Sequence, residues 1–289
     1  ETGPGPCVQA PSGLVGWWPL DDAVGQNTVQ DAAGGNNGTT KDASGNPLNI
    51  SPGGAVSQLP DPINIPGLNP VVVDPSTSPP RGALFFKSNS FAEVPHNSNL
   101  NIGPNGFTIT LWAWAPAVPI PIEPLVEKFD LATTNGYSLY LEATGSGTYA
   151  LKFNLNGTVV TGPSVPFATA PTDWRFIVAR VSSSGSVTLT VCDLGGSCTT
   201  SPSTTVTSFT TSNTAPLWFA RSAAANPAAV FTGLRLALDE IEIFNRALTQ
   251  AELQTIYDAE RQGTRKCPPA ACVPPPSDMV VWYPLDEPA

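Results

Sequence analysis

The stretch LDEIEIFNRALTQAEL, residues 238–253, combines a strand pattern with the start signal of a helix. Residues 234–244, LRLALDEIEIF, largely alternate apolar and polar side chains, as a β-strand does. Thr249 is a candidate N-cap, and Glu252 three residues later completes a capping box. Leu248 and Leu253 have the spacing of a hydrophobic staple across this cap. We therefore predict a strand that leads directly into a short helix, with Gly263 at its end.

Short strand-like segments separated by turn residues occupy most of the chain before this point. The clearest is FTITLWAWA, residues 107–115, in which apolar Phe107, Ile109 and Leu111 share one face and Trp112 and Trp114 share the other. The others are residues 14–18, 82–86, 91–95, 124–130, 137–143, 149–155, 174–182, 186–192 and 216–220. Many short strands without helices between them predict an all-β sandwich rather than alternating strands and helices.

Several of these segments, taken in order, carry a family resemblance. GLVGWWPLDD, DAAGGNNGT, ALFFKSNSFAEVP, FTITLWAWAP, LVEKFD, WRFIVARV and LDEIEIFNRALTQAEL resemble the concanavalin A-like, laminin-G-type (pentraxin-like) jelly roll. The resemblance covers about residues 12–260 except for the Pro/Gly-rich segment 42–80, which we interpret as a surface insertion. It implies two stacked antiparallel sheets and a non-catalytic role in adhesion or carbohydrate recognition. The turn KSNS departs from the acidic, glycine-containing turn of many members.

A calcium site is the metal site that this sequence favours. The turn DAAGGNNGT offers oxygen ligands from Asp31, Asn36 and Asn37, among glycines that let backbone carbonyls point inward. The resemblance adds Asp239, because in the family the aspartate of the closing motif often meets such a turn. The alternative is that Asp31 caps the turn and Asp239 accepts backbone hydrogen bonds. The expected calcium is structural rather than catalytic.

Ligand binding and catalysis have weaker signals. Trp114 is the candidate for stacking on a sugar ring, whereas Trp112 is commonly a packing residue in the family. In glycoside hydrolases of the same fold, one strand carries three acidic residues at alternating positions. Here Glu240 and Glu242 are followed by Phe244, so we interpret Glu242 as a solvent-facing residue and expect no enzyme. The single histidine, His96, lies in a loop without a nucleophile elbow, which argues against a serine triad.

Composition points to an extracellular β protein. The charged fraction is 12%, against roughly 25% in average soluble domains, and the formal net charge is −10. A chain without a basic stripe is not expected to bind nucleic acid, and no apolar run is long enough to span a membrane. We expect a secreted or cell-surface protein whose ligand is a carbohydrate or another surface group.

The five cysteines agree with an oxidising compartment. Cys192 and Cys198 flank a Gly-Gly turn and predict a disulfide that staples a hairpin. Cys7 and Cys267 bracket the whole module, and we pair them across its two ends. The alternative pair is Cys267 with Cys272.

The end of the chain repeats its beginning. Residues 272–287, CVPPPSDMVVWYPLDE, align without a gap to residues 7–22, CVQAPSGLVGWWPLDD. We therefore expect a jelly-roll module at 7–266, a proline-rich linker at 267–276 and the truncated first strand of a following repeat at 277–289. Residues 1–3, ETG, resemble a remnant of signal cleavage. The strand at 277–289, anchored by Trp282, is expected to pair with another copy or a neighbouring repeat, or to lie beside the ends of its own domain. A purely structural spacer repeat is the alternative function.

Overall fold

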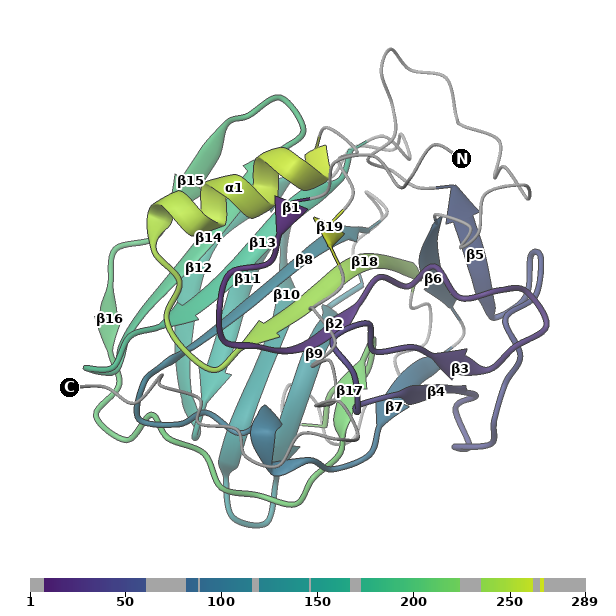
Figure 1. Ribbon diagram of the computed structural model, residues 1–289, viewed down its shortest axis with the longest axis horizontal. Coiled ribbons are helices and arrows are strands. Elements are labelled where there is room, and N and C mark those ends of the chain that lie inside the picture. Colours follow the sequence, from purple (N-terminus) through teal and green to yellow (C-terminus); the bar gives the residue numbers. More distant parts are fainter. Residues whose placement is uncertain are drawn as a thin grey trace, which may run out of the picture.

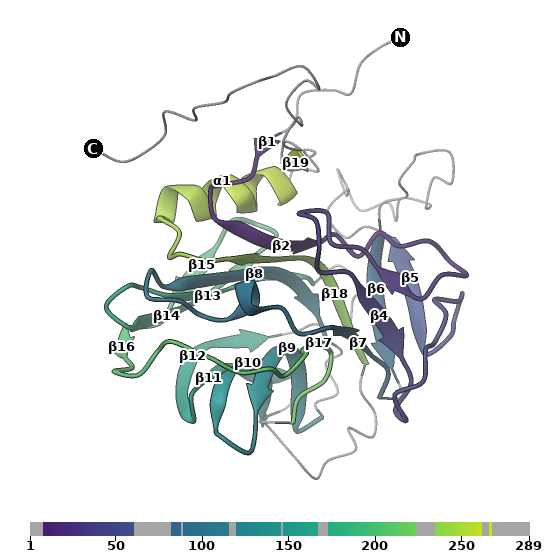
Figure 2. The ribbon, with the colours of Figure 1, turned by 60° about the horizontal axis from the view of Figure 1, so that its bottom comes forward.

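The structure, a computed structural model, describes residues 8–60, 82–87, 89–115, 120–145, 147–166, 173–223, 235–261 and 266–267. Two antiparallel β-sheets stack face to face, and helix α1 (Gln250–Arg261) lies on the outer face of one of them (Figure 1 and Figure 2). Figure 2 shows the three layers, with α1 uppermost and the second sheet at the bottom. This is the predicted all-β sandwich with one short C-terminal helix.

The sheet beneath α1 has nine strands. Its main path runs β15 (Cys198–Thr200), β14 (Ser186–Asp193), β13 (Arg175–Val181), β8 (Phe107–Trp114), β18 (Arg235–Phe244), β6 (Gly82–Lys87) and β5 (Val56–Pro60). Two more strands lie off this path, β16 (Thr204–Thr205) beside β14 and β2 (Leu14–Trp18) beside β18. Strand β18 is therefore central, with β8 on one side and both β6 and β2 on the other.

The second sheet has eight strands. Their order is β12 (Thr158–Pro166), β11 (Thr148–Leu155), β10 (Asn135–Gly145), β9 (Ile122–Asp130), β17 (Leu217–Phe219), β7 (Phe91–Val94), β4 (Gly38–Lys41) and β3 (Thr28–Val29). A single 3₁₀ turn, Ser98–Leu100, follows β7. The described parts contain no helix that is both long and apolar enough to cross a membrane.

The apolar core lies between the two sheets. Phe107, Ile109 and Leu111 point into it from β8, as their alternation predicts, and all three are fully buried. Trp18 of β2 packs edge-on against Phe219 of β17, with ring centroids 5.0 Å apart. Burying each such side chain stabilises the fold by roughly 1.5–3 kcal/mol. These contacts join the two sheets.

A second apolar cluster lies between α1 and the nine-stranded sheet. Leu248 and Leu253, the predicted staple, are both buried in it. Tyr257 of α1 stacks on Trp112 of β8, with centroids 5.8 Å apart and ring planes 21° apart. The indole Nε1 of Trp112 donates a hydrogen bond of 2.8 Å to the buried carboxylate of Glu260. Trp112 is thus a packing residue, as the resemblance implies.

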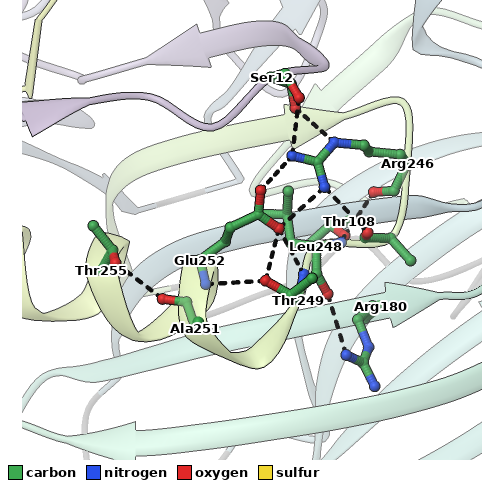
Figure 3. A network of polar contacts seen from close by, with 10 residues as sticks. Ser12, Thr108, Arg180, Arg246, Leu248, Thr249, Ala251, Glu252 and Thr255 are labelled. Carbon is green, nitrogen blue, oxygen red and sulfur yellow. Dashed lines mark hydrogen bonds and ion pairs between the residues drawn. The ribbon is translucent and has the colours of Figure 1, made fainter.

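The predicted capping box is present at the start of α1. The Glu252 carboxylate accepts from Thr249 N at 2.8 Å, and Glu252 N donates to Thr249 Oγ1 at 3.3 Å. Arg246 joins this box to the N-terminal part of the chain, because its guanidinium contacts Glu252 at 2.5 Å and donates to the carbonyl of Ser12 at 2.9 Å (Figure 3). The closing motif therefore holds the segment before β2 and the helix together.

Three features differ from the expectations. Segment 42–80 is described as far as Pro60, and there it contributes the edge strand β5 and the buried side chains of Ile50 and Val56, so this part is no mere surface insertion. Strands β3, β4 and β12 were not predicted. Glu242, expected to face solvent, is fully buried.

The two ends of the module lie side by side. Strand β1 (Val8–Gln9) pairs in parallel with β19 (Lys266–Cys267). Cys192 and Cys198 form the predicted disulfide between β14 and β15, and Cys267 is also disulfide-bonded. Cys7, Cys272, Trp282 and the expected repeat strand at 277–289 lie outside the described residues, as does Gly263.

Peptide mapping without reduction should recover Cys7 linked to Cys267. The physical reason is that β1 lies beside β19, with Gln9 in register with Cys267, which brings the start and the end of the module within reach of one disulfide. The same map should contain the Cys192–Cys198 peptide as an internal control. A peptide that joins Cys267 to Cys272 would contradict this prediction.

At acid pH the Arg246–Glu252 ion pair should no longer contribute to the free energy of unfolding. Hydrogen bonds from Arg246 and then from the Thr249 backbone lower the pKa of Glu252 from 4.5 to about 2. Because the pKa is lower in the folded state, the stabilisation is complete above the ordinary pKa and is lost as the pH falls toward about 2. Glu252→Gln should therefore lower the melting temperature at neutral pH and have little effect near pH 2. A melting-temperature difference that stays constant over this range would contradict the assignment.

Candidate functional site

The outer face of the eight-stranded sheet carries an aromatic and charged cluster over β4, β7 and β17. Trp218 pairs with Glu93, and Glu93 pairs with Thr39, so these side chains share one face of the sheet. Their chain neighbours Ala92 and Phe219 point into the core. No described helix or strand covers this face, since α1 lies against the other sheet (Figure 2). Glu93, Trp218 and Arg221 are each partly exposed on this face.

Glu93 organises the polar groups of this cluster. Its two carboxylate oxygens accept from Lys41 Nζ at 2.6 Å and from Trp218 Nε1 at 2.9 Å. Partial burial acts to raise the pKa of Glu93, but the hydrogen bonds from Lys41 and Trp218 and the charges of Lys41 and Arg221 outweigh it and lower that pKa. Glu93 is thus a carboxylate at neutral pH, and it fixes the orientation of the Trp218 ring.

Arg221 completes the cluster just after β17. Its guanidinium carbon lies 4.2 Å from the centroid of the Phe91 ring and 4.6 Å from that of Trp218. The two rings are nearly perpendicular, at 74°, so the guanidinium fits into the angle between them. Phe91 is almost fully buried, whereas Arg221 and Trp218 remain partly exposed. The exposed surface of the cluster is therefore an indole beside a guanidinium.

Polar groups continue this face toward β9 and β10. The buried carboxylate of Glu127 accepts from Ser222 Oγ and, at 2.6 Å, from the backbone N–H of Ala223. Ser222 Oγ also lies 3.3 Å from Ser138 Oγ. Farther along, Lys152 of β11 forms an ion pair with Glu142 at 3.1 Å. Hydrogen-bonding groups thus flank the indole of Trp218 on both sides.

The predicted ligand residue Trp114 lies on the other sheet. It projects from β8 beside Phe85, with ring centroids 6.0 Å apart, and packs against the cluster beneath α1. Its side chain is partly buried. Sequence reasoning identified PLWFA only as a strand, although buried Leu217 and Phe219 leave Trp218 as the outward residue of that alternation.

The predicted calcium turn is held by its own hydrogen bonds. The Asp31 carboxylate accepts from Trp17 N and Ala33 N through Oδ1, and from the backbone and side-chain N–H groups of Asn36 through Oδ2. The amide oxygen of Asn37 accepts from Asp31 N at 2.8 Å. A cation would have to displace these donors, so the residues as arranged do not fit a calcium ion. The bonds match the alternative, in which Asp31 caps the turn.

Asp239 lies on β18, in register with Trp112 of β8. Within the described ranges no group of three or more His, Cys, Asp or Glu side chains is arranged to hold a metal ion. The structure therefore brings Asp31, Asn36 and Asn37 together in one turn, while Asp239 belongs to the sheet beneath α1. Calcium at these four residues was the expectation from the sequence, and the melting experiment described below tests it against the turn-cap alternative.

The acids that resemble a glycosidase pair do not follow the regular alternation of a strand. The register of β18 against β8 shifts between Asp239 and Glu242, and Glu240 has φ of 50°, so a β-bulge inserts Glu240 as an extra residue. The Glu240 carboxylate accepts from Trp17 Nε1 at 2.7 Å. Buried Glu242 accepts from Thr110 Oγ1 at 2.9 Å. Both carboxylates thus have structural partners within the nine-stranded sheet.

Two further titratable groups have unusual surroundings. Glu123 of β9 is fully buried opposite Leu141, and burial raises its pKa well above the ordinary value. Its carboxyl oxygens have no hydrogen-bond partner among the residues that the structure describes. Burial lowers the pKa of Lys128 to about 8. Its ammonium donates to Asn213 and lies 3.1 Å from Nδ1 of exposed His96. Neither group lies in the outward cluster around Trp218.

A family model places the chain among known proteins. The laminin G model of the concanavalin A-like lectin/glucanases superfamily matches residues 86–254, which is more than half of the chain. The chain belongs to this superfamily. No curated protein matches the sequence.

Solved structures share the concanavalin A-like fold at low sequence identity. The binding domain of Paraclostridial Mosquitocidal Protein 1 is 17% identical with a TM-score of 0.55, over 86% of this chain and 52% of that one. Trypanosoma rangeli sialidase in complex with sialic acid is 13% identical with a TM-score of 0.52, over 86% of this chain and 33% of that one. Domain 4 of the extracellular arabinanase AbnA from Geobacillus stearothermophilus, in complex with arabinotriose, is 15% identical with a TM-score of 0.50. This match covers 84% of this chain and 98% of that one. The chain thus spans about half of the first of these proteins and a third of the second.

Removing the Asp31 carboxylate should destabilise this concanavalin A-like domain to the same degree with and without calcium. Asp31→Ala leaves buried backbone N–H groups without an acceptor, which costs about 1–3 kcal/mol for each such group. Melting curves in excess calcium and in excess chelator should both show this loss. A loss confined to the calcium-containing sample, together with a lower melting temperature of the wild type in chelator, would instead establish the metal site.

Proposed function

We propose that the chain is a non-catalytic carbohydrate-binding module of an extracellular protein, and that it binds its ligand on the outer face of the eight-stranded sheet. The observation that carries this proposal is the partly exposed Trp218, whose indole is held by the hydrogen bond to Glu93 and by its contact with Arg221. The apolar face of a sugar ring stacks on a planar aromatic ring, and its hydroxyls need hydrogen-bonding groups at the edges. A side chain that is already fixed loses little conformational entropy on binding.

The relatives support this proposal at the level of the fold. The arabinanase domain was solved with arabinotriose, and the mosquitocidal structure is named a binding domain. The Cys192–Cys198 disulfide and the bonded Cys267 favour an oxidising, extracellular location. Glycosidases need a pair of carboxyl groups that flank a bound sugar. The structural partners of Glu240 and Glu242 argue that neither serves this role.

A structural spacer repeat is the second candidate, and the repeated sequence favours it. A Cβ atom added to Gly16 would lie 2.4 Å from Cη2 of Trp18. In the repeat, Val281 aligns with Gly16 and Tyr283 aligns with Trp18. Both positions thus change together in the repeat, to a larger residue at the first and to a side chain without the second indole ring at the other, which favours two copies of one repeated unit. A spacer would bind no saccharide.

Replacing Trp218 should abolish saccharide binding, whereas replacing Trp114 should not. On an oligosaccharide array, Trp218→Ala should weaken the binding of every wild-type ligand by at least about tenfold, or about 1.4 kcal/mol. Trp218→Phe should retain part of the affinity, and Trp114→Ala is the matched control on the other sheet. Thermal melts check that each variant is folded. Binding that is lost with Trp114→Ala and kept with Trp218→Ala, or a wild type that binds no saccharide, would overturn the proposal.

A further inference from the structure

We infer that the ligand of this face is an acidic saccharide, whose carboxylate is bound by the guanidinium of Arg221 while a ring stacks on Trp218. This inference rests on the proposed function and adds the chemical class of the ligand. It starts from the geometry of Arg221, which differs from that of an ordinary surface arginine.

Among the described residues, Arg221 is held in position by contacts with two aromatic rings. Its guanidinium lies over both the Phe91 ring and the Trp218 ring, at 4.2 and 4.6 Å from their centroids. Each of these contacts is favourable, because the ring quadrupole attracts the cation. Two such contacts from different strands, β7 and β17, restrict a side chain that would otherwise be mobile. The group is thus held ready before a ligand arrives.

Within the described ranges, no hydrogen bond uses the N–H groups of Arg221. A guanidinium has five N–H donors, all in its plane, and in the described part of the chain Arg221 donates no hydrogen bond and forms no ion pair. Stacking on a ring uses the faces of the guanidinium and leaves the N–H groups at its edges available. A carboxylate accepts two parallel bonds from such an edge, which makes Arg a better partner for it than Lys.

The local charge also favours an anion. The charge of Arg221 acts on Glu93, but this carboxylate is already matched by its ion pair with Lys41 at 2.6 Å and by the indole N–H of Trp218. Glu127, the other acid of this face, accepts from Ser222 and Ala223. The charge of Arg221 is therefore not cancelled by an ion pair, in a protein whose formal net charge is −10. Because the net negative charge of the protein repels anions in general, a local cationic group favours only those anions that also fit the site.

The stacked indole decides between a saccharide and a simple anion. A carboxylate alone would need only the guanidinium, whereas Trp218 presents an apolar ring directly beside it, with ring centroid and guanidinium carbon 4.6 Å apart. In a uronic acid the carboxylate is attached directly to a carbon of the pyranose ring. One sugar unit can therefore stack on Trp218 and bind the guanidinium of Arg221. The pair Trp218 and Arg221 thus matches one acidic sugar.

The test compares acidic oligosaccharides with their carboxyl-reduced forms. The probes are galacturonate oligomers and glucuronate-containing hyaluronan oligomers, each beside a reduced counterpart that has the same linkages and no charge. Titration calorimetry of the wild type should give at least about tenfold tighter binding of one acidic probe than of its reduced form. This ratio should fall as salt is added, because screening weakens the charge contact.

Variants separate the inference from the proposed function. Arg221→Gln should bring the ratio of acidic to reduced affinity close to one, and Arg221→Lys should restore it in part. Lys152→Gln removes the same charge elsewhere on this sheet and should leave the ratio unchanged. If the wild type binds both forms equally and Trp218→Ala abolishes both, the inference fails and the proposed function stands. If Lys152→Gln lowers the ratio as much as Arg221→Gln, the charge contact is unspecific and the inference fails. If the wild type binds neither form, both fail.

Discussion

The register of strand β18 is the constraint on which the rest of the structure depends. Along its length β18 pairs with β8 on one side, and with β6 and then β2 on the other. The bulge at Glu240 shifts the alternation, so that Leu238 and Ile241 both point into the core although three positions separate them. A non-glycine residue with positive φ costs on the order of 1–3 kcal/mol, and paired strands on both sides together with the bond from Trp17 offset that cost. Without this shift, either Leu238 or Ile241 would leave the core.

The end of β18 also determines which face of the sandwich stays open. Directly after Phe244, the Arg246 guanidinium and the capping box turn the chain into α1, and the stack of Tyr257 on Trp112 holds that helix against the nine-stranded sheet. The helix therefore covers the outward aromatic residues of one sheet. In the described part of the chain no helix or strand lies over the outer face of the other sheet. That face carries Trp218 on β17 and Arg221 just after it, and the neighbouring side chains Leu217 and Phe219 are buried in the core. The rigidity of the proposed site comes from this packing.

Much of the fold could be predicted because strong local signals agree with the tertiary structure. The alternation of apolar residues at 107–115 predicts strand β8, and the capping box at Thr249 predicts the start of α1. The edge strands β5 and β12 escaped prediction because they contain proline, which an edge tolerates and a central strand does not. The bulge at Glu240 has no local signal, since a glutamate rarely adopts positive φ. The site around Trp218 was missed because a period of two identifies the outward residues and does not tell which outer face the helix will cover.

The signals of the tryptophan indole N–H groups in a nuclear magnetic resonance spectrum test the central claim most directly. The indole groups of Trp17, Trp18, Trp112 and Trp218 donate to four different acceptors, namely Glu240, the Asn36 carbonyl, Glu260 and Glu93, so substitution can assign each signal. Titration with an acidic oligosaccharide should shift the Trp218 signal in a saturable manner and leave those of Trp17, Trp18 and Trp112 in place. A saturable shift of the Trp114 signal with Trp218 unmoved would show that the ligand binds the nine-stranded sheet, and would contradict the account.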